Sequence, residues 1–229
     1  MATLGWLLYR ASELRGRVIV LPVASVEEHG CLPAATDYLL GLCLGERLEG
    51  VEGVAVLPPL PYTLCAEHPV CIDAGEAWRL EAYLEAVAAS AARISGAGVV
   101  LAVTHGGAYH AAYAAARSVS RSTRVRVAVV NVVEEAVRGA GRAGCLEHAG
   151  VVEASMLAAC GVWLGDCMAA GLEAECLEPG SVQPWMHSDY RCSELYPSRI
   201  AASRELGEKA WRTVVERIRL IAGRLLSSR

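Results

Sequence analysis

Glu27, His29 and Asp37 are three side chains near the start of the sequence that can bind a metal ion. Glu27 and His29 are two positions apart, and in an extended segment this spacing points both side chains to the same side. Gly30 permits a turn, so that Asp37, which follows Thr36 as the expected N-cap of a helix, can face the same pocket. Carboxylate and imidazole groups together are typical ligands of zinc, manganese and iron. The alternative is that the glutamates here are solvated loop charges and that His29 is a hydrogen-bonded structural residue.

A second histidine that can bind a metal, His105, directly follows an apolar run over residues 99–104. Open α/β sheets bind ligands at the carboxyl ends of their strands, so we expect His105 on the same rim as Glu27 and His29. Gly106 and Gly107 come next, and they either let the backbone approach a ligand closely or serve a tight turn from strand to helix. The sequence has no G-x-G-x-x-G motif after a strand and no Walker loop, so a nucleotide-binding fingerprint is not indicated.

His148 and Glu153 form a third candidate group, at the start of an expected helix. Five positions correspond to about 140° around a helix, so the two side chains cannot lie along one helical face. We therefore expect His148 in the loop before the helix and Glu153 in its first turn, where Glu153 can fill a metal position. The alternative is that Glu153 is a surface residue favoured at a helix N-terminus by the helix dipole.

The elements that must position these residues alternate in type along the chain, which predicts an α/β fold. Four continuous apolar runs are typical of strands buried on both faces, and they predict one three-layer αβα domain, residues 1–229, with a mostly parallel central sheet. The expected strands are Arg17–Ala24, Val54–Leu60, Val99–Thr104 and Val125–Val132, and the expected helices are Asp37–Leu48, Glu76–Ile94, Tyr109–Ser120, Val151–Leu164 and Ser198–Ser227. Residues 165–197 show no periodicity, so we expect them to cover a binding site or to pack against a neighbour.

The composition excludes several classes of protein. The 229 residues are 54% hydrophobic and carry a net charge of -4, which favours a globular chain and argues against nucleic acid as a partner. No apolar run is long enough for a membrane span, and the N-terminal residues lack the apolar core of a secretion signal, so we expect a cytoplasmic protein with no membrane partner.

The nine cysteines include no C-x-x-C pair. They indicate neither a disulfide framework nor a zinc ribbon, and we expect most of them to be small buried hydrophobic residues.

Taken together, these motifs resemble the creatininase (creatinine amidohydrolase) family. The matching segments are Glu27-x-His29-Gly30 with Leu32-Pro33 and Thr36-Asp37, then His105-Gly106-Gly107, then His148-Ala149 with Glu153-Ala154-Ser155, and finally Tyr196-Pro197-Ser198 with Glu205-Leu206-Gly207. They occur in the order and approximate spacing of that family and cover nearly the whole chain. Several separated motifs in one order are more specific than any one of them.

The resemblance implies a two-metal centre that hydrolyses a small amide or another non-peptide C–N bond, in a homo-oligomer such as a hexamer. It implies two divalent ions per chain, zinc, iron or manganese, with Glu27 and His105 on one ion, His29 and Glu153 on the other, and Asp37 bridging them. His148 would be the catalytic histidine. In creatininase itself a glutamate two residues after the equivalent of His105 is a ligand; that position is a glycine here, and Glu153 must replace it.

One departure from the family pattern bears on the substrate. The family's H-G-x-H-L-P segment is His29-Gly30-Cys31-Leu32-Pro33 here, so its second histidine is missing and the loop is one residue shorter. The loss argues against creatinine and resembles the archaeal branch of the family, which removes a formyl group from a formylaminopyrimidine ribonucleotide in riboflavin and deazaflavin synthesis. The alternatives are creatinine, a short peptide cleaved by a related metallopeptidase, and a non-catalytic small-molecule binding protein whose pocket has lost its metals.

Two further side chains are candidates for substrate binding, together with Gly106 and Gly107. His68 follows the second expected strand, in a region that contributes to pockets in the family that this chain resembles. Trp185 lies in the aperiodic segment and could close over a flat ring, although a core or subunit contact is equally consistent with its position.

Overall fold

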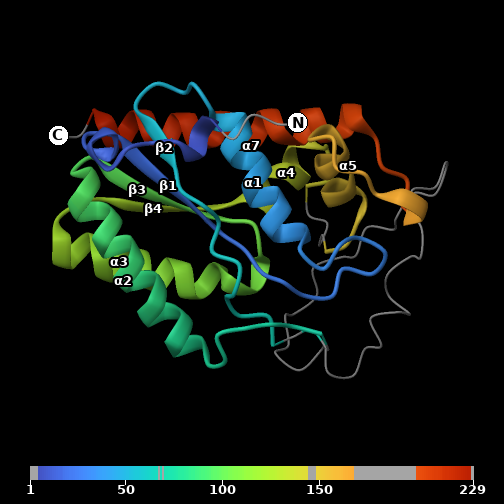
Figure 1. Cartoon of the computed structure of the whole chain (residues 1–229), viewed down its shortest axis with the longest axis horizontal. Helices are drawn as coiled ribbons and strands as arrows, with labels where there is room; N and C mark the ends of the chain where they lie inside the picture. The colour runs from blue at the N-terminus through green and yellow to red at the C-terminus, as the bar shows by residue number, and fades with distance from the viewer. Residues whose placement is uncertain (1–4, 67, 69, 144–147, 168–199, 228–229) are drawn as a thin grey trace.

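A four-stranded parallel sheet forms the centre of the computed structural model, which describes residues 5–66, 68, 70–143, 148–167 and 200–227 (Figure 1). The strands are β1 (Val18–Val23), β2 (Val54–Val56), β3 (Gly98–Val103) and β4 (Val127–Asn131), in the spatial order β2-β1-β3-β4. All three pairings are parallel, with Val18 opposite both Val54 and Gly98, and Val99 opposite Val127. The predicted α/β fold with a parallel sheet is confirmed.

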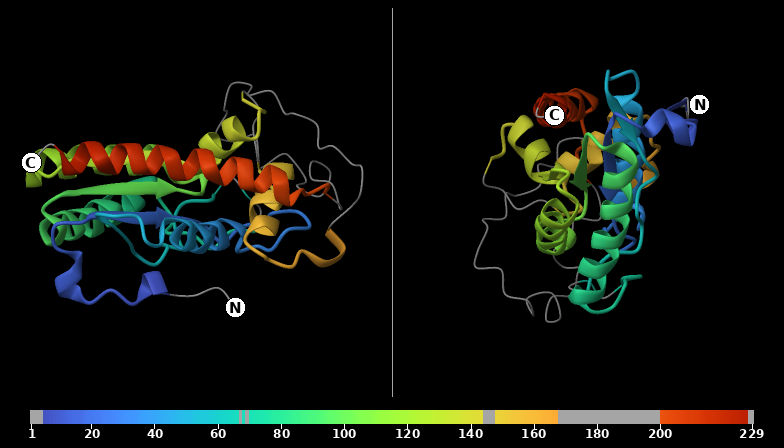
Figure 2. Two further views of the ribbon diagram at one scale, coloured as in Figure 1. Left: turned by 90° about the horizontal axis from the view of Figure 1, so that it is seen from above. Right: turned by 90° about the vertical axis from the view of Figure 1, so that its left-hand side faces the viewer.

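Helices cover both faces of the sheet, which is why the strands are apolar throughout. The helices are α1 (Thr36–Leu48), α2 (Ala77–Ser95), α3 (Tyr109–Thr123), α4 (Val132–Gly139), α5 (Val151–Ala159) and α7 (Arg204–Leu226), with short 3-10 turns η1 (Gly5–Leu7), η2 (Ala11–Leu14), η3 (Gly106–Ala108) and η4 (Gly165–Cys167). Figures 1 and 2 show α2 and α3 side by side on one face, and α1, α4, α5 and α7 on the other. Along β1, Val18 and Val20 pack into the core beneath α7, while Ile19 and Leu21 pack against α2 and α3.

The boundaries of several elements differ from the prediction. Thr36 is the first residue of α1 and Ala35 is its N-cap, and the hydroxyl of Thr36 donates a hydrogen bond backwards to the carbonyl of Pro33 at 2.7 Å. α5 ends at Ala159, five residues earlier than expected, and Gly161 follows it with a φ of 77°. α7 begins at Arg204, where the hydroxyl of Ser203 accepts the amide of Leu206. The sequence prediction also missed α4, which the side chain of Asn131 caps.

The order of the strands determines where a ligand can bind. The chain passes from β1 to β2 on one side and returns to place β3 on the other side, so the order reverses between β1 and β3. In open parallel sheets, ligands bind in the crevice beyond the carboxyl ends of the strands at such a reversal. The loops that follow β1 and β3 begin at this crevice.

None of the helices in the described part of the chain is both long and apolar enough to cross a lipid bilayer.

α5 and α7 pack in close contact, and this packing fixes the position of α5. The indole of Trp211 donates a hydrogen bond to the carbonyl of Met156 at 3.0 Å, and the amide of Ser203 donates one to the hydroxyl of Ser155 at 2.9 Å. At Gly207 the backbone of α7 lies against the carbonyl of Ser155, so that a Cβ atom there would clash with backbone. A glycine at this position therefore allows α5 to approach the rest of the core.

We predict that Gly207→Ala destabilises the protein by about 3 kcal/mol, because backbone cannot yield to the added methyl group as a side chain can. Gly223→Ala is the matched control on the same helix, since no atom outside its own helical turn lies within 4 Å of a Cβ there. That substitution should be neutral or should stabilise the helix by up to about 1 kcal/mol. Urea unfolding of both variants measures the difference, and equal stabilities would contradict the packing described.

Candidate metal centre

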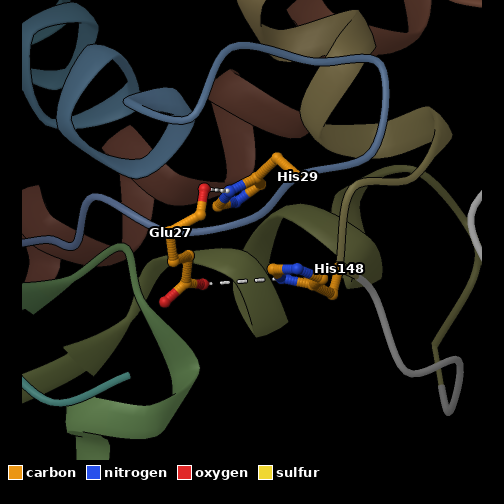
Figure 3. Close-up of side chains that lie close together, drawn as sticks. All are labelled: Glu27, His29 and His148. Atoms are coloured by element: carbon orange, nitrogen blue, oxygen red, sulfur yellow. Dashed lines mark hydrogen bonds and ion pairs between the residues drawn. The ribbon is translucent and has the colours of Figure 1, made fainter. Parts of the chain in front are cut away.

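The loop after β1 brings Glu27, His29 and Asp37 together. The side chains of Glu27, His29 and Asp37 are at most 2% exposed, and Nε2 of His29 lies 3.5 Å from Oδ1 of Asp37. Figure 3 shows Glu27 and His29 on this loop, with the carboxylate of Glu27 directed toward His148. The hydroxyl of Ser25 donates a hydrogen bond to Oδ2 of Asp37 at 2.7 Å and so orients that carboxylate. The turn predicted from Gly30 is present, with a φ of 56°.

His105 lies at the carboxyl end of β3 and faces the same two carboxylates. Its Nδ1 is 3.1 Å from Oε1 of Glu27 and 3.2 Å from Oδ2 of Asp37. The hydroxyl of Thr104 donates to the carbonyl of Asp37 at 3.0 Å, which ties the first turn of α1 to the end of β3. Two loops that are far apart in the sequence therefore meet at the crevice.

His148 and Glu153 complete the group from the third side. His148 precedes α5 and Glu153 lies in its first turn, as the spacing predicts. Nδ1 of His148 is 3.7 Å from Oε1 of Glu27, and its ring lies 4.4 Å from that of His29, centroid to centroid. Oε2 of Glu153 accepts a hydrogen bond from the amide of Ala149 at 2.7 Å, so one of its two oxygens binds the backbone just before its own helix. Glu153 is 2% exposed and is not a surface residue.

Backbone carbonyls hold one ring nitrogen of each of these three histidines. Nδ1 of His29 lies 3.2 Å from the carbonyl of Glu27, Nε2 of His105 contacts that of Leu64, and Nε2 of His148 lies 2.8 Å from that of Glu28. A carbonyl only accepts hydrogen bonds, so the nitrogen beside it carries the hydrogen. In the neutral ring the other nitrogen then presents its lone pair to the carboxylates. Histidines that bind metals are commonly oriented in this way.

The ligand atoms form two groups that share Asp37. Glu27, Asp37 and His105 place one atom each within 4.8 Å of one another, and His29, Asp37 and Glu153 do the same. A third such group contains Glu27, His29 and His148. The geometry can therefore accommodate two neighbouring cations with Asp37 between them.

The charges of the cluster favour a cation. Burial raises the pKa of Glu27, whereas for Asp37 the adjacent His105 and His29 overcome the effect of burial and hold its pKa well below the ordinary value. Burial disfavours the charged form of His29, but the Asp37 carboxylate dominates and raises the pKa of His29 to about 9. In the described part of the chain, the basic side chains within 4 Å of Glu27 and Asp37 are all histidines. Protons on His29 and His105, whose pKa values the adjacent carboxylates raise against the effect of burial, compensate the carboxylates when no ion is bound.

The donor atoms also fit a divalent ion. Neither carboxylate oxygen of Glu27 makes a hydrogen bond within the described residues, and neither does Nε2 of His29. Buried oxygen and nitrogen atoms without hydrogen bonds are costly unless another partner satisfies them. These three atoms point into the cluster, and divalent zinc, manganese and iron accept such mixed oxygen and nitrogen donors.

The candidate substrate residues fall into two sets. His68 is at this site: its Nε2 is 3.4 Å from Oε1 of Glu27, and its ring stacks on that of His148 with centroids 4.3 Å apart. Gly106 and Gly107 form η3 directly after His105, and a Cβ atom at Gly106 would meet no atom within 4 Å. Trp185 lies outside the described residues. Ser25 and the carbonyl of Leu64 were not predicted, and only the position of Ser25 directly after the expected strand Arg17–Ala24 could have indicated a role.

The prediction for the cysteines was wrong in part. Cys31 is joined to Cys167 and Cys65 to Cys71 in disulfides, whereas Cys43 is a buried free thiol as expected. The paired residues are 136 and 6 positions apart, and neither spacing is a known disulfide signature. Cys65 and Cys71 also lie near Asp73 in a group that could hold a metal, but in the disulfide their sulfur atoms are not thiolates.

Comparison with known proteins identifies the fold and the family. A family model described as creatininase, creatinine amidohydrolase, matches residues 2–221. The chain belongs to the creatininase family. Members of this family are metal-dependent amidohydrolases that act on C–N bonds, which is the chemistry that the creatininase motifs in the sequence imply. None of the proteins with curated descriptions matches the chain in sequence.

Three solved structures illustrate how closely this creatininase-family chain follows the fold. A crystal structure of creatinine amidohydrolase has a TM-score of 0.74 at 22% identity and covers 93% of this chain and 92% of its own. A creatininase mutant described as Zn-Zn type has a TM-score of 0.70 at 21% identity, covering 90% and 89%. A putative creatinine amidohydrolase from Bacteroides fragilis NCTC 9343 has a TM-score of 0.66 at 20% identity, covering 95% and 92%.

We predict that metal binding releases protons and strengthens as the pH rises toward about 9, because an ion must displace the proton of His29. For one displaced proton, the apparent affinity should rise about tenfold per pH unit between pH 6.5 and 9. The stability of the metal-free protein should instead fall as the pH rises. The stability that protonated His29 contributes is present below pH 6.5 and is lost as the pH rises through about 9. Calorimetric titration of zinc in two buffers of different ionisation enthalpy measures the protons released. A binding enthalpy that is the same in both buffers at pH 8 would contradict this assignment.

Proposed function

We propose that this chain hydrolyses a non-peptide C–N amide bond with two divalent ions, zinc, iron or manganese, in the cluster after β1 and β3. The observation that supports this most directly is the pair of ligand groups that share Asp37. Glu27 and His105 would complete one ion position, and His29 and Glu153 the other. When bound, a pair of divalent ions would supply Lewis-acid chemistry, namely activation of a water molecule and polarisation of the carbonyl oxygen of the substrate.

His148 is the residue we assign to proton transfer. Its Nε2 donates to the carbonyl of Glu28, so Nδ1 is the atom that faces Glu27 and the cluster. Burial, together with His29 and His68, holds the pKa of His148 well below its usual value, so the ring begins the reaction neutral. It can then accept a proton at Nδ1 as water attacks and deliver the same proton to the departing nitrogen.

The substrate we propose is a formylated aminopyrimidine ribonucleotide, 2-amino-5-formylamino-6-ribosylaminopyrimidin-4(3H)-one 5'-monophosphate, which loses its formyl group. The support comes from Cys31, which stands in the short loop after His29 where the family pattern continues to a second histidine. Its side chain is joined to Cys167, so this part of the loop offers a disulfide and no imidazole to a substrate. Creatinine and short peptides are the alternative substrates.

Four residues would contact the substrate in this proposal. His68 is placed to do so by its position beside Glu27 and His148. Gly106 leaves open space beside His105, and Gly107 follows it in η3, so a substrate can approach the backbone here. Trp185 remains a prediction from the sequence.

Product assays on the formylaminopyrimidine nucleotide, creatinine and short peptides test the proposal, together with elemental analysis of the purified protein. We expect close to two equivalents of divalent metal per chain and release of formate from the nucleotide. Turnover of creatinine or a peptide alone would correct the substrate and retain the mechanism. Absence of metal together with absence of turnover would favour a non-catalytic binding protein.

We predict that His148→Ala retains both ions and loses about 10²- to 10⁴-fold in kcat, the usual contribution of a general acid or base. His110→Ala is the matched control, because His110 is an exposed histidine on α3. Steady-state kinetics and metal content of both variants provide the comparison. Full activity of the His148 variant would refute the role given to this residue.

We predict that Asp37→Ala loses both ions, since both of the proposed ion positions include this carboxylate. Glu28→Gln should retain both, because within the described residues the Glu28 side chain accepts a hydrogen bond only from the amide of Gly30, and a glutamine oxygen can do the same. Elemental analysis after gel filtration distinguishes the two variants. An Asp37 variant that still holds two ions would rule out the shared carboxylate.

A further inference from the structure

A disulfide-closed loop lies directly over one of the two ligand groups. We define the loop 63–74 by its described residues, 63–66, 68 and 70–74, and its ends are joined by a hydrogen bond from the amide of Ala74 to the carbonyl of Thr63. Within it, Cys65 and Cys71 form a disulfide that encloses His68. Val70 and Ile72 are 59% and 57% exposed, so the apolar side chains around Cys71 do not anchor this part of the loop in the core.

The loop 63–74 contacts three of the residues that surround the first ion position, Glu27, His105 and His148. The carbonyl of Leu64, which is next to Cys65, accepts a hydrogen bond from Nε2 of His105. Cys71 pairs with Glu27 in an antiparallel bridge, flanked by hydrogen bonds from Glu28 to Val70 at 2.8 Å and from Ile72 to Val26 at 3.0 Å. His68, between the two cysteines, contacts the Glu27 carboxylate and stacks on His148.

The second disulfide is placed in a similar way at the other ligand group. Cys31 lies two residues after His29, in the turn closed by a hydrogen bond from the amide of Leu32 to the carbonyl of His29 at 2.9 Å. Cys167 lies in η4, which follows α5, the helix that carries Glu153. The disulfide between them therefore joins the loop that carries His29 to the segment that follows the helix of Glu153.

We infer that each disulfide positions one ion site: Cys65–Cys71 the site of Glu27 and His105, and Cys31–Cys167 the site of His29 and Glu153. The inference rests on the proposed two-metal function and goes beyond it by assigning four cysteines as positioning residues. Outer contacts that orient metal ligands typically change metal affinity by about 10- to 100-fold. A cross-link that limits the movement of such contacts should act on the same scale, and on the nearer ion.

The test uses variants of the full chain that remove one cross-link at a time. Peptide mapping under non-reducing conditions first establishes that both disulfides are present. Zinc affinity is then measured by competition with a chelator, and anomalous diffraction from zinc-loaded crystals gives the occupancy of each position. Cys65→Ala/Cys71→Ala should weaken the Glu27 and His105 position at least about tenfold and leave the other within twofold. Cys31→Ala/Cys167→Ala should give the reverse pattern.

Matched controls keep the result specific. Cys43→Ala/Cys160→Ala removes two thiols that form no disulfide and should leave both affinities unchanged. Where a double variant does not fold, Cys71→Ala alone or Cys31→Ala alone breaks the same cross-link and leaves the other cysteine in place, and circular dichroism confirms that the protein is folded.

The outcomes separate this inference from the proposed function. If the unmodified protein binds no ion, the proposed function fails. If it binds two ions but neither disulfide variant changes either affinity, or if either variant weakens both positions equally, the assignment of one disulfide to one site is wrong. Absence of the cross-links in the peptide map would also overturn it.

Discussion

Three buried carboxylates beyond the ends of two strands are the constraint on which the site depends. Glu27, Asp37 and Glu153 are each at most 2% exposed, and charged groups are costly to bury unless a positive partner compensates them. The surrounding histidines can supply that charge as protons, and two divalent ions can supply more of it. The cluster is thus suited to exchange protons for metal, which links the acid–base state of the protein to its occupancy.

The fold creates this constraint through its strand order. Reversal of the order between β1 and β3 brings two loops to one crevice, and the continuous apolar strands hold them there with both faces covered. The third contribution comes from α5, which no strand precedes directly. Its position depends on α7, against which it packs through Trp211 and the close backbone contact at Gly207.

The parts of this arrangement that could be predicted from the sequence are those with a local pattern. Apolar runs indicated all four strands because helices cover both faces of the sheet, although the edge strand β4 is only half-buried, and the residues that follow β1 and β3 were therefore expected at one rim. The pairing of Cys31 with Cys167 could not be predicted, because it depends on two segments that approach only in the folded chain. The contact of His105 with the carbonyl of Leu64 was missed for the same reason, since backbone acceptors leave no signal in the residue types.

The ligands come from segments distributed between Glu27 and Glu153, and the last of these segments is held in place by α7 near the end of the chain. The site needs the loop after β1, Glu153 and α7, and no contiguous half of the sequence contains all three. A chain that lacks α7 would therefore contain every ligand, but α5 and its Glu153 would lose the packing that fixes their position. The ability to retain metal should then arise only when the last helix is in place, so that metal retention reports whether the whole chain has folded.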